Sequence, residues 1–439
     1  MSADGQRGNV AAFIQRNLRW NFIALSCDYG LFGLGLTLAS TYTVLAAFAE
    51  RLGASNLLIG ALPAVQTLGW GLPALLAANY TERQARKMPL VLSITLLERV
   101  PYLLIGLAAL MLAESQPALA LALTIVFVAT MAFSGGVLMP AWMDVIAKVI
   151  PMHLRGRFFA LGDVLSGLMG VGGAALVGYF LTNYAFPLSY ALCFFAAAGA
   201  AGISFVFLAS TREYAAPPTK PAIDLATYMR RLPGLLRTDR DFTNYMLARA
   251  LSLGSTAAFA FYTVYGLVRL HAQEEQVASF TLFLLLSEAS STVLLGWLAD
   301  RFGHRTVLML GAAAGIVGNP IAMLAWSPEV LYPVFALMGT ARAATIVAHQ
   351  SIILEFGGAE DRPTYVGLAG TLMAPVALGA PLLGGVLADN VGYEVVFATA
   401  AALAFLNLLC LATLVREPRR VQAQAGEKTG QLGASEPEV

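Results

Sequence analysis

Residues 277–326 read VASFTLFLLLSEASSTVLLGWLADRFGHRTVLMLGAAAGIVGNPIAMLAW, and this stretch decides the fold. It contains two long apolar blocks, Val277 to Ala299 and Thr306 to Trp326, joined by a short charged segment. About twenty apolar residues in a helix that rises 1.5 Å per residue cross the ~30 Å hydrocarbon core of a bilayer. The stretch therefore predicts two membrane-crossing helices with a tight connection between them.

The same alternation of apolar blocks and polar connections continues in both directions. The chain has 439 residues, of which 58% are apolar and 12% charged, whereas soluble domains are roughly 25% charged. We expect an all-α polytopic membrane protein whose transmembrane helices form two pseudo-symmetric six-helix bundles. The predicted spans are Trp20 to Ala47, Asn56 to Tyr80, Pro89 to Leu112, Ala118 to Met139, Phe158 to Leu181, Pro187 to Ala209, Phe242 to Val268, Val277 to Ala299, Thr306 to Trp326, Val330 to Leu354, Tyr365 to Ala388 and Tyr393 to Val415.

A polar connection rich in proline and arginine divides these spans into two groups. Within it, Asp224 to Arg237 alternates apolar and basic residues at helical spacing, which is typical of a helix lying on the inner membrane surface. The expected organisation is an N-terminal segment (1–19), a six-helix bundle (20–211), a linker (212–241), a second bundle (242–416) and a disordered tail (417–439).

The distribution of charge predicts orientation and excludes some functions. Basic residues concentrate in the connections on one side, so the positive-inside rule places both termini in the cytoplasm of a plasma (inner) membrane protein. The 27 basic and 26 acidic residues leave no basic surface for nucleic acid. The three cysteines lie inside apolar blocks without metal or disulfide spacing. We also expect the first helix to be retained, since no cleavage signature follows it.

Two connections recur in the two halves. Glu82 to Lys87 (ERQARK) aligns with Asp300 to Arg305 (DRFGHR), and Arg155 to Leu161 aligns with Arg362 to Leu368. In the first pair of segments, an acid and an arginine precede a small residue and a basic pair. Two related six-helix units of like orientation explain both recurrences.

The segment Gly296 to Arg305, GWLADRFGHR, resembles the signature loop of the major facilitator superfamily, G-x-x-x-D-R-x-G-x-R/K. That loop joins the second and third helices of a six-helix unit and clamps the cytoplasmic ends together in the outward-open state. Gly296 would let a neighbouring helix approach, and Gly303 would permit a tight turn. Asp300 would sit at a helix end beside Arg301 and Arg305.

The first-half copy of this loop departs from the pattern, with alanine at both glycine positions and glutamate in place of aspartate. Residues 151–157 (PMHLRGR) resemble the P-x-x-x-R-G-R turn that follows the fourth helix in many members, with an upstream aspartate as a partner. The resemblance thus implies a cytoplasmic gating set of Gly296, Asp300, Arg301, Gly303, Arg305, Glu82, Arg83, Lys87, Asp144 and Arg155.

Charged side chains inside the apolar blocks are the candidates for a functional site, because each costs about 3 kcal/mol or more at membrane depth unless it faces water or a partner. In the superfamily, the first, fourth, seventh and tenth helices line a central cavity, which here directs attention to Asp28, Arg249, Arg342 and His349. Asp28 either takes part in proton coupling or solute contact, or forms an ion pair with Arg249. The two arginines suit a carboxylate or phosphate on a solute, unless Asp28 or Glu288 neutralises them.

Several other side chains have two interpretations each. His349 is a proton acceptor or a hydrogen-bonding core residue, and Glu288 is a second possible proton site. Glu98 and Arg99 are adjacent on one helix, so we expect them not to pair with each other and to serve structural or lipid-interface roles. Aromatic residues could line a solute site or anchor the helices at the membrane surface: Tyr42, Trp142, Tyr262 and Tyr265.

The resemblance implies a secondary active or facilitative transporter that moves a small solute by alternating access, coupled to protons. The alternatives are an exporter of amphipathic compounds, such as drugs or lipids, and a non-transporting sensor on the same fold. Because the sequence lacks HExxH, Walker and diphosphate motifs, we expect no enzyme activity and no cofactor or metal. The expected partners are a small-molecule solute, a proton and membrane lipid, and the expected state is a monomer.

Overall fold

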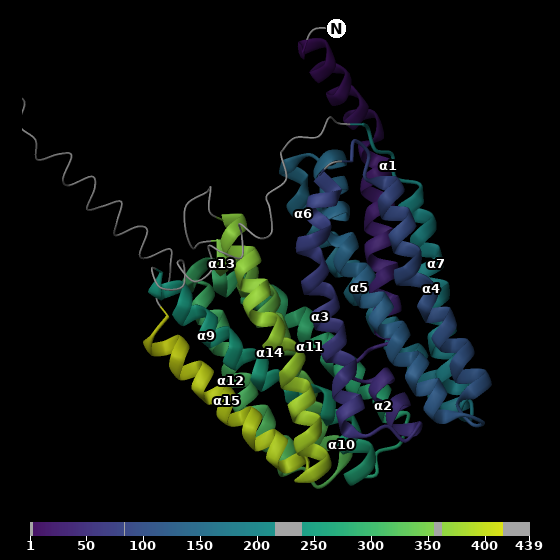
Figure 1. Ribbon diagram of the computed structural model, residues 1–439, viewed down its shortest axis with the longest axis vertical. Coiled ribbons are helices and arrows are strands. Elements are labelled where there is room, and N and C mark those ends of the chain that lie inside the picture. Colours follow the sequence, from purple (N-terminus) through teal and green to yellow (C-terminus); the bar gives the residue numbers. More distant parts are fainter. Residues whose placement is uncertain (1–2, 83, 216–238, 355–361, 416–439) are drawn as a thin grey trace, which may run out of the picture.

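The computed structural model describes residues 3–82, 84–215, 239–354 and 362–415, so the predicted surface helix in the linker, Arg83 and the tail lie outside the described residues. All regular elements in these ranges are helices (Figure 1). The long ones are α1 (Ala3–Leu38), α3 (Asn56–Glu82), α4 (Met88–Leu112), α5 (Pro117–Val149), α6 (Met152–Asn183), α7 (Leu188–Ala209), α9 (Arg240–Ser255), α11 (Gln276–Phe302), α12 (His304–Met323), α13 (Leu331–Leu354), α14 (Arg362–Asn390) and α15 (Tyr393–Thr413). The short ones are α2 (Val44–Arg51), η1 (Thr256–Ala258), α10 (Phe259–Arg269) and η2 (Pro328–Val330).

The twelve predicted spans are all present as helices. Among the described residues, 11 stretches are long and apolar enough to cross a membrane, and α9, η1 and α10 together make one of them. Helix α3 is not among those stretches, but with 27 residues it is long enough to be the remaining span. The fold class expected from the sequence is therefore confirmed.

Two spans differ in detail from the prediction. The first was expected to run unbroken from Trp20 to Ala47, but α1 begins at Ala3 and ends at Leu38, and the chain turns before α2. The seventh span is interrupted by η1, where the hydroxyl groups of Ser255 and Thr256 each donate to a backbone carbonyl three residues earlier, both at 2.8 Å. Such side-chain bonds compete with the regular helix pattern. Hydrophobicity alone does not reveal these breaks.

Among the described residues, the apolar core joins the two halves of the chain at one end only. One buried cluster combines aromatic residues of the first half, such as Phe48 and Phe194, with residues of the second half, such as Phe261, Phe280 and Phe397. Two further clusters are separate, one formed only by residues of the first half and one only by residues of the second. We call the end with the shared cluster, around α2 and α10, the closed end. The opposite end is the open end.

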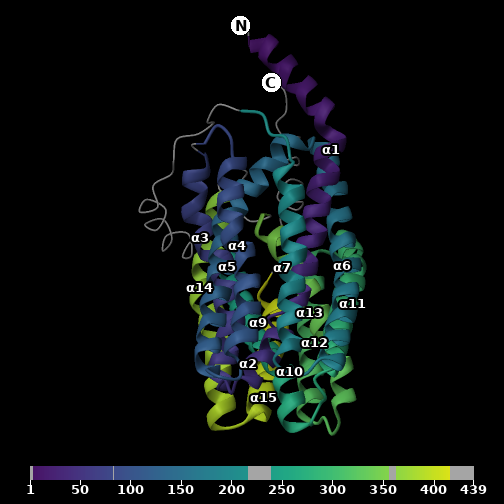
Figure 2. The same cartoon turned by 90° about the vertical axis from the view of Figure 1, so that its right-hand side faces the viewer.

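Figure 1 shows the same arrangement, because the two groups of helices converge around α2 and α10 and diverge in the opposite direction. Figure 2 shows that the long helices run nearly parallel to one another, so every span reaches from one end of the molecule to the other. The first turns of α1 project beyond the bundle at the open end (Figures 1 and 2).

Helices α3 and α14 make the tightest crossing between the halves. A β-carbon added to Gly60 would lie 2.4 Å from the carbonyl oxygen of Pro381, and one added to Gly385 would lie 2.6 Å from the carbonyl oxygen of Asn56. Backbone atoms on both sides leave no room for a larger residue. Glycine at these two positions is therefore what allows the closed end to pack.

Candidate functional site

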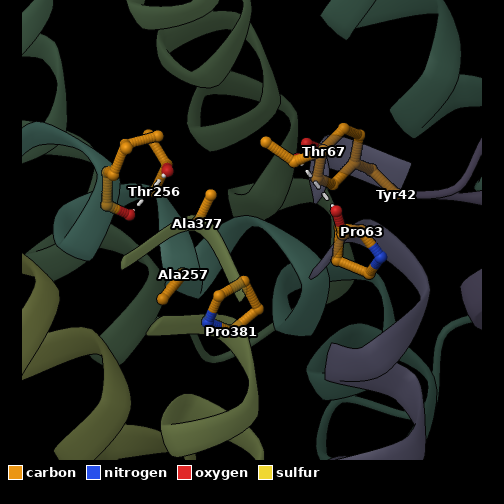
Figure 3. Close-up of a pocket in the computed structure, with 8 residues that line it drawn as sticks. Tyr42, Pro63, Thr67, Thr256, Ala257, Ala377 and Pro381 are labelled. Carbon is orange, nitrogen blue, oxygen red and sulfur yellow. Dashed lines mark hydrogen bonds between the residues drawn. The ribbon is translucent and has the colours of Figure 1, made fainter. Parts of the chain in front are cut away.

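A cavity whose empty space of about 320 Å³ includes open solvent lies between the two halves, next to the closed end. Figure 3 shows side chains of both halves around it. Thr67 Oγ1 donates to the Pro63 carbonyl at 2.9 Å and Thr256 Oγ1 donates to the Leu253 carbonyl at 2.8 Å, so both hydroxyl groups already bond within their own helices. The exposed surface of the lining is polar and apolar in about equal parts. The lining consists of Tyr42, Pro63, Thr67, Leu253, Thr256, Ala257, Ala377 and Pro381.

A charged pair adjoins this cavity. Arg342 Nε on α13 donates to Glu288 Oε2 on α11 at 2.8 Å. The guanidinium carbon lies 5.0 Å from the centre of the Tyr42 ring, which is a cation–π distance. The two charged side chains keep 31% and 19% of their surface exposed, so neither is fully buried. Of the two interpretations of Arg342, neutralisation by Glu288 is the one that the structure shows.

Arg249 and His349 lie in a second cavity, of about 180 Å³, inside the second bundle. His349 Nδ1 bonds to the Tyr245 hydroxyl. Among the described residues, Nε and Nη1 of Arg249 and Nε2 of His349 are buried without a hydrogen-bond partner. Since Arg342 pairs with Glu288 and adjoins the other cavity, the two arginines do not converge on one anion, and that expectation is wrong for this conformation.

Asp28 faces the interior of the first bundle. Its Oδ1 accepts hydrogen bonds from Arg99 Nη2 at 2.8 Å and from Ser204 Oγ at 2.5 Å. The expected ion pair between Asp28 and Arg249 is therefore not formed. The direction of a side chain around a helix depends on packing, and Asp28 points toward α4 and α7.

Glu98 and Arg99 belong to the same buried cluster. Arg99 Nη1 lies 3.3 Å from Glu98 Oε2, and Thr95 Oγ1 donates to that same oxygen at 3.4 Å. The expectation that these neighbours do not pair is wrong, because the long arginine side chain reaches back to the preceding residue. Their exposed fractions, 4% for Glu98 and 7% for Arg99, also exclude a lipid-facing role in this structure.

Most of the aromatic candidates pack away from the cavity. Tyr262 is 1% exposed and its hydroxyl donates to Asn319 Oδ1 at 2.9 Å. Tyr265 is buried against Phe397, with ring centres 5.2 Å apart, and Trp142 packs on Tyr29, with ring centres 6.0 Å apart. These three residues are not part of the cavity lining, which leaves Tyr42 as the aromatic residue at the site.

The signature loop forms the expected turn but not the expected clamp. Gly303 has a φ of +92°, which favours glycine, so this part of the prediction is confirmed. Arg305 donates to the carbonyls of Leu411 and Ala412, at 2.7 and 2.6 Å, and so caps the end of α15. The Arg301 guanidinium lies over the Trp297 ring at 5.7 Å, and Asp300 is exposed.

Gly296 lacks the close neighbour that was expected, as far as the described residues go. Among them, a β-carbon added to Gly296 would meet nothing within 4 Å, so no described helix approaches it closely in this conformation. The reason is that the two halves diverge at the open end, where this loop lies (Figure 1).

In the first half, a residue that the sequence did not single out organises the corresponding loop. The Glu213 carboxylate accepts from the backbone N–H groups of Lys87 and Met88 at 2.8 Å each, which caps α4, and from Lys148 Nζ at 2.9 Å. Asp144 lies 3.4 Å from Lys148 and 3.7 Å from Lys87. The side chain of Glu82, another residue of the predicted gating set, lies outside the described part of the structure.

Asp144 is not the partner of Arg155, contrary to the expectation from the turn motif. Arg155 donates instead to the carbonyls of Ala147 at 2.6 Å and Ile150 at 3.1 Å, and so caps the end of α5. Arg155 and Arg305 thus perform the same task in the two halves, each closing the open-end terminus of a helix.

The hydrogen bonds and ion pairs that we identify between the halves, all among described residues, lie at the closed end. The Asp389 carboxylate of α14 accepts from the backbone N–H and the side-chain amide of Asn56, both at 2.9 Å, and from the backbone N–H of Leu57 at 3.1 Å. An acid of one half thereby caps the first turn of α3 in the other half. The other contacts are Tyr393 with Asn56 (2.7 Å), Arg51 with Glu274 (3.0 Å), Thr263 with Tyr42 (2.7 Å) and Thr281 with Thr43 (2.7 Å).

Comparison with known proteins shows a shared fold over most of the chain and a family likeness over part of it. The family model described as Major Facilitator Superfamily matches residues 269–436. The chain is 26% identical over 152 residues to an efflux pump, dotC, of Dothistroma septosporum, covering 34% of this chain and 26% of that protein. It is 29% identical over 160 residues to a chloramphenicol resistance protein of Pseudomonas aeruginosa, covering 35% and 36%. The chain thus spans only about a third or less of these curated relatives.

Solved structures match over nearly the whole chain. A mutant of the nucleoside transporter NupG superposes with a TM-score of 0.71 at 11% identity, covering 90% of this chain and 99% of that one. A D-xylose-proton symporter superposes with a TM-score of 0.66 at 15% identity, covering 90% and 98%. At these identities the likeness shows the shared fold alone. Taken together, the family match over residues 269–436, the partial relatives and the two six-helix groups support the major facilitator superfamily as the family that this multi-pass membrane protein resembles in sequence and in fold.

Proposed function

We propose that this protein is a carrier that moves a small solute across the membrane by alternating access, and that the cavity beside Tyr42 is where the solute binds. The observation that carries the proposal is the position of that cavity. It lies on the boundary between the two halves, directly inside the closed end. A site on this boundary can be exposed to either side in turn when the halves rock against each other.

The structure corresponds to one of the two states that such a cycle needs. The closed end holds a shared apolar core and the inter-half hydrogen bonds, whereas the cores separate toward the open end. We assign the open end to the cytoplasm because the basic connections lie there. The state is then inward-facing, in a plasma (inner) membrane with both termini inside. In the outward-facing state, the signature loop at Gly296 would gain the neighbour that it lacks here.

The lining of the cavity indicates the kind of solute. Five of the eight lining residues have aliphatic side chains, and about half of the exposed lining surface is polar, with both threonine hydroxyl groups bonded within their own helices. The charged pair of Arg342 and Glu288 approaches the cavity through Tyr42. A small amphipathic molecule, with an apolar body in the cavity and a polar group near this pair, fits best. We therefore favour export of such compounds, in line with the names of the relatives, an efflux pump and a chloramphenicol resistance protein. A free anion fits less well, because it must compete with Glu288 for Arg342.

Coupling to protons is part of the proposal, and the protein is proposed to work as a monomer. Carboxyl groups at membrane depth are present in both halves, at Asp28 and Glu98 in the first and at Glu288 in the second. A bound proton drives transport only if its affinity differs between the two states, so the carrying group must change its surroundings when the halves move.

The proposal is tested by filling the cavity in protein reconstituted into vesicles. Chloramphenicol and ethidium serve as probes, with and without an imposed pH gradient. Ala377→Trp puts a large side chain into the lining, whereas the matched Ala398→Trp places the same side chain on an exposed part of α15. We expect Ala377→Trp to reduce flux at least tenfold and Ala398→Trp to retain it. Equal flux in both variants would refute the assignment of the cavity. A sensor on this fold would show no flux of any probe.

A further inference from the structure

We propose that the buried cluster of Asp28, Glu98 and Arg99 binds one proton, held on Glu98, and that this is the coupling proton of the carrier. The coupling role of this proton rests on the proposed transport function. Proton binding by the cluster does not, and it can be tested without any transport.

The charges in the cluster do not balance without a proton. The guanidinium of Arg99 keeps its charge at all relevant pH values. Two carboxyl groups face it, and the side chains of Asp28, Glu98 and Arg99 keep only 4%, 6% and 7% of their surface exposed. If both carboxyl groups were ionised, one negative charge would be buried without a partner, which proteins avoid by binding a proton. With one proton the cluster is neutral, and release of that proton leaves a net charge of −1.

The geometry places the proton on Glu98. Asp28 accepts two short hydrogen bonds, from Arg99 at 2.8 Å and from Ser204 at 2.5 Å, and these favour its ionised form. Glu98 has only the longer contacts with Arg99 at 3.3 Å and Thr95 at 3.4 Å. Glu98 is therefore the less stabilised anion of the two.

No other charged group completes the balance in the part of the chain that the structure describes. The charged groups acting on Glu98 are Arg99 and Asp28. The remaining neighbours are uncharged and come from every packed helix: Phe32 of α1 under the guanidinium, Tyr102 of α4, Ser204 of α7, Trp70 of α3, and Gly135 and Trp142 of α5. Nε of Arg99 and the hydroxyl of Tyr102 are buried without partners, so the cluster also retains unused hydrogen-bonding groups.

The position of Glu98 connects the proton to the movement of the halves. A β-carbon added to Gly135 would lie 2.8 Å from Glu98 Oε1 and 3.3 Å from the Trp70 ring, so the carboxyl group sits against α5 with α3 beside it. Helix α3 also makes the tight crossing with α14 at the closed end. In the proposed cycle, separation of α3 from α14 also shifts α3 relative to α5 within the first half, and this shift of Trp70 changes the access of water to Glu98. The proton then leaves to, or arrives from, the water on the side that is open.

The bound proton is tested on the purified full-length protein by infrared difference spectroscopy during a pH titration. A protonated carboxyl group in a dry site gives a carbonyl stretching band that shifts in deuterated water. We expect this band to disappear in Glu98→Gln, which mimics the protonated residue and should fold. It should also disappear in Asp28→Asn, because Arg99 and an ionised Glu98 then balance. The control Asp163→Asn, which removes a carboxyl group bonded to Tyr29 in the same half, should retain the band. A band unchanged in both cluster variants would overturn the proposal.

The coupling role is tested separately in vesicles with chloramphenicol and ethidium. The ratio of accumulation driven by a pH gradient to solute exchange without a gradient should fall at least tenfold in Glu98→Gln and stay unchanged in the control Asp163→Asn. Retained accumulation in Glu98→Gln would overturn the coupling role. If the unmodified protein moves neither probe, the proposed function fails for these solutes, while the infrared result still decides whether the cluster binds a proton.

Discussion

Asp389 is the residue whose replacement tests most sharply how the closed end is held. Its carboxylate accepts three hydrogen bonds from the first turn of α3, although it belongs to α14 in the other half. In Asp389→Ala, all three are lost. Loss of an acidic cap costs about 1 kcal/mol, and loss of its charge at a helix N-terminus costs about 0.3 to 1 kcal/mol when the site is exposed, as it is here.

Because this contact exists only while the closed end is closed, its loss acts on the balance between the two states. A change of about 1 to 2 kcal/mol alters the ratio of the states by roughly 5-fold to 30-fold in favour of the state in which this end opens. The measurement is the distance distribution between spin labels at Glu114 and Trp326, two exposed positions in connections of opposite halves at the closed end.

The matched control is Glu394→Ala. It removes the same charge from an exposed position near Asp389, in a residue with no identified hydrogen bond to α3. We expect the long-distance population to grow in Asp389→Ala and to stay unchanged in Glu394→Ala. If the two variants give the same distribution as the unmodified protein, the cap across the halves does not hold the closed end, and the reasoning is refuted.

Three further predictions concern other contacts. Gly60→Ala should force α3 and α14 apart and increase the long-distance population. Gly71→Ala in the same helix should not, because a β-carbon there meets no described atom within 4 Å. Equal behaviour of the two variants would contradict the tight crossing. Burial raises the pKa of Glu50 above its ordinary value, against the opposing effect of Arg51, so the closed end should be most stable at low pH and weaken as the pH rises through that pKa. Glu50→Gln should remove this dependence in the same distance measurement, and its persistence would exclude Glu50 as the cause. Arg305→Ala should lower the free energy of unfolding by about 1 kcal/mol because α15 loses its cap, as measured by chemical denaturation, while Arg301→Ala should have a smaller effect.

The helices were predictable because their signal is local. A block of about twenty apolar residues must cross the bilayer whatever its neighbours are, and the twelve predicted blocks are helices in the structure. The turn at Gly303 was predictable for a similar reason, since a positive φ needs a glycine at that position. The helix breaks were not predictable from hydrophobicity, because the interruption near Thr256 depends on hydroxyl groups that bond to the backbone.

Partners between helices could not be predicted, because they depend on the rotation of each helix about its axis. Asp28 was expected to face Arg249 but pairs with Arg99, and the adjacent Glu98 joins the same cluster. Asp389 and Glu213 were missed because each caps a helix that is distant in sequence. The sequence around an acidic residue near the end of an apolar block does not indicate which helix terminus lies beside it in the fold.

The central claim is that the two halves open at one end as they close at the other, around the cavity beside Tyr42. The most direct measurement compares two label pairs under the same conditions: Glu114 with Trp326 across the closed end, and Arg157 with Phe302 across the open end. We predict opposite responses, so that any condition that lengthens one distance shortens the other. A protein in which both distances stay fixed, or lengthen together, would contradict the claim.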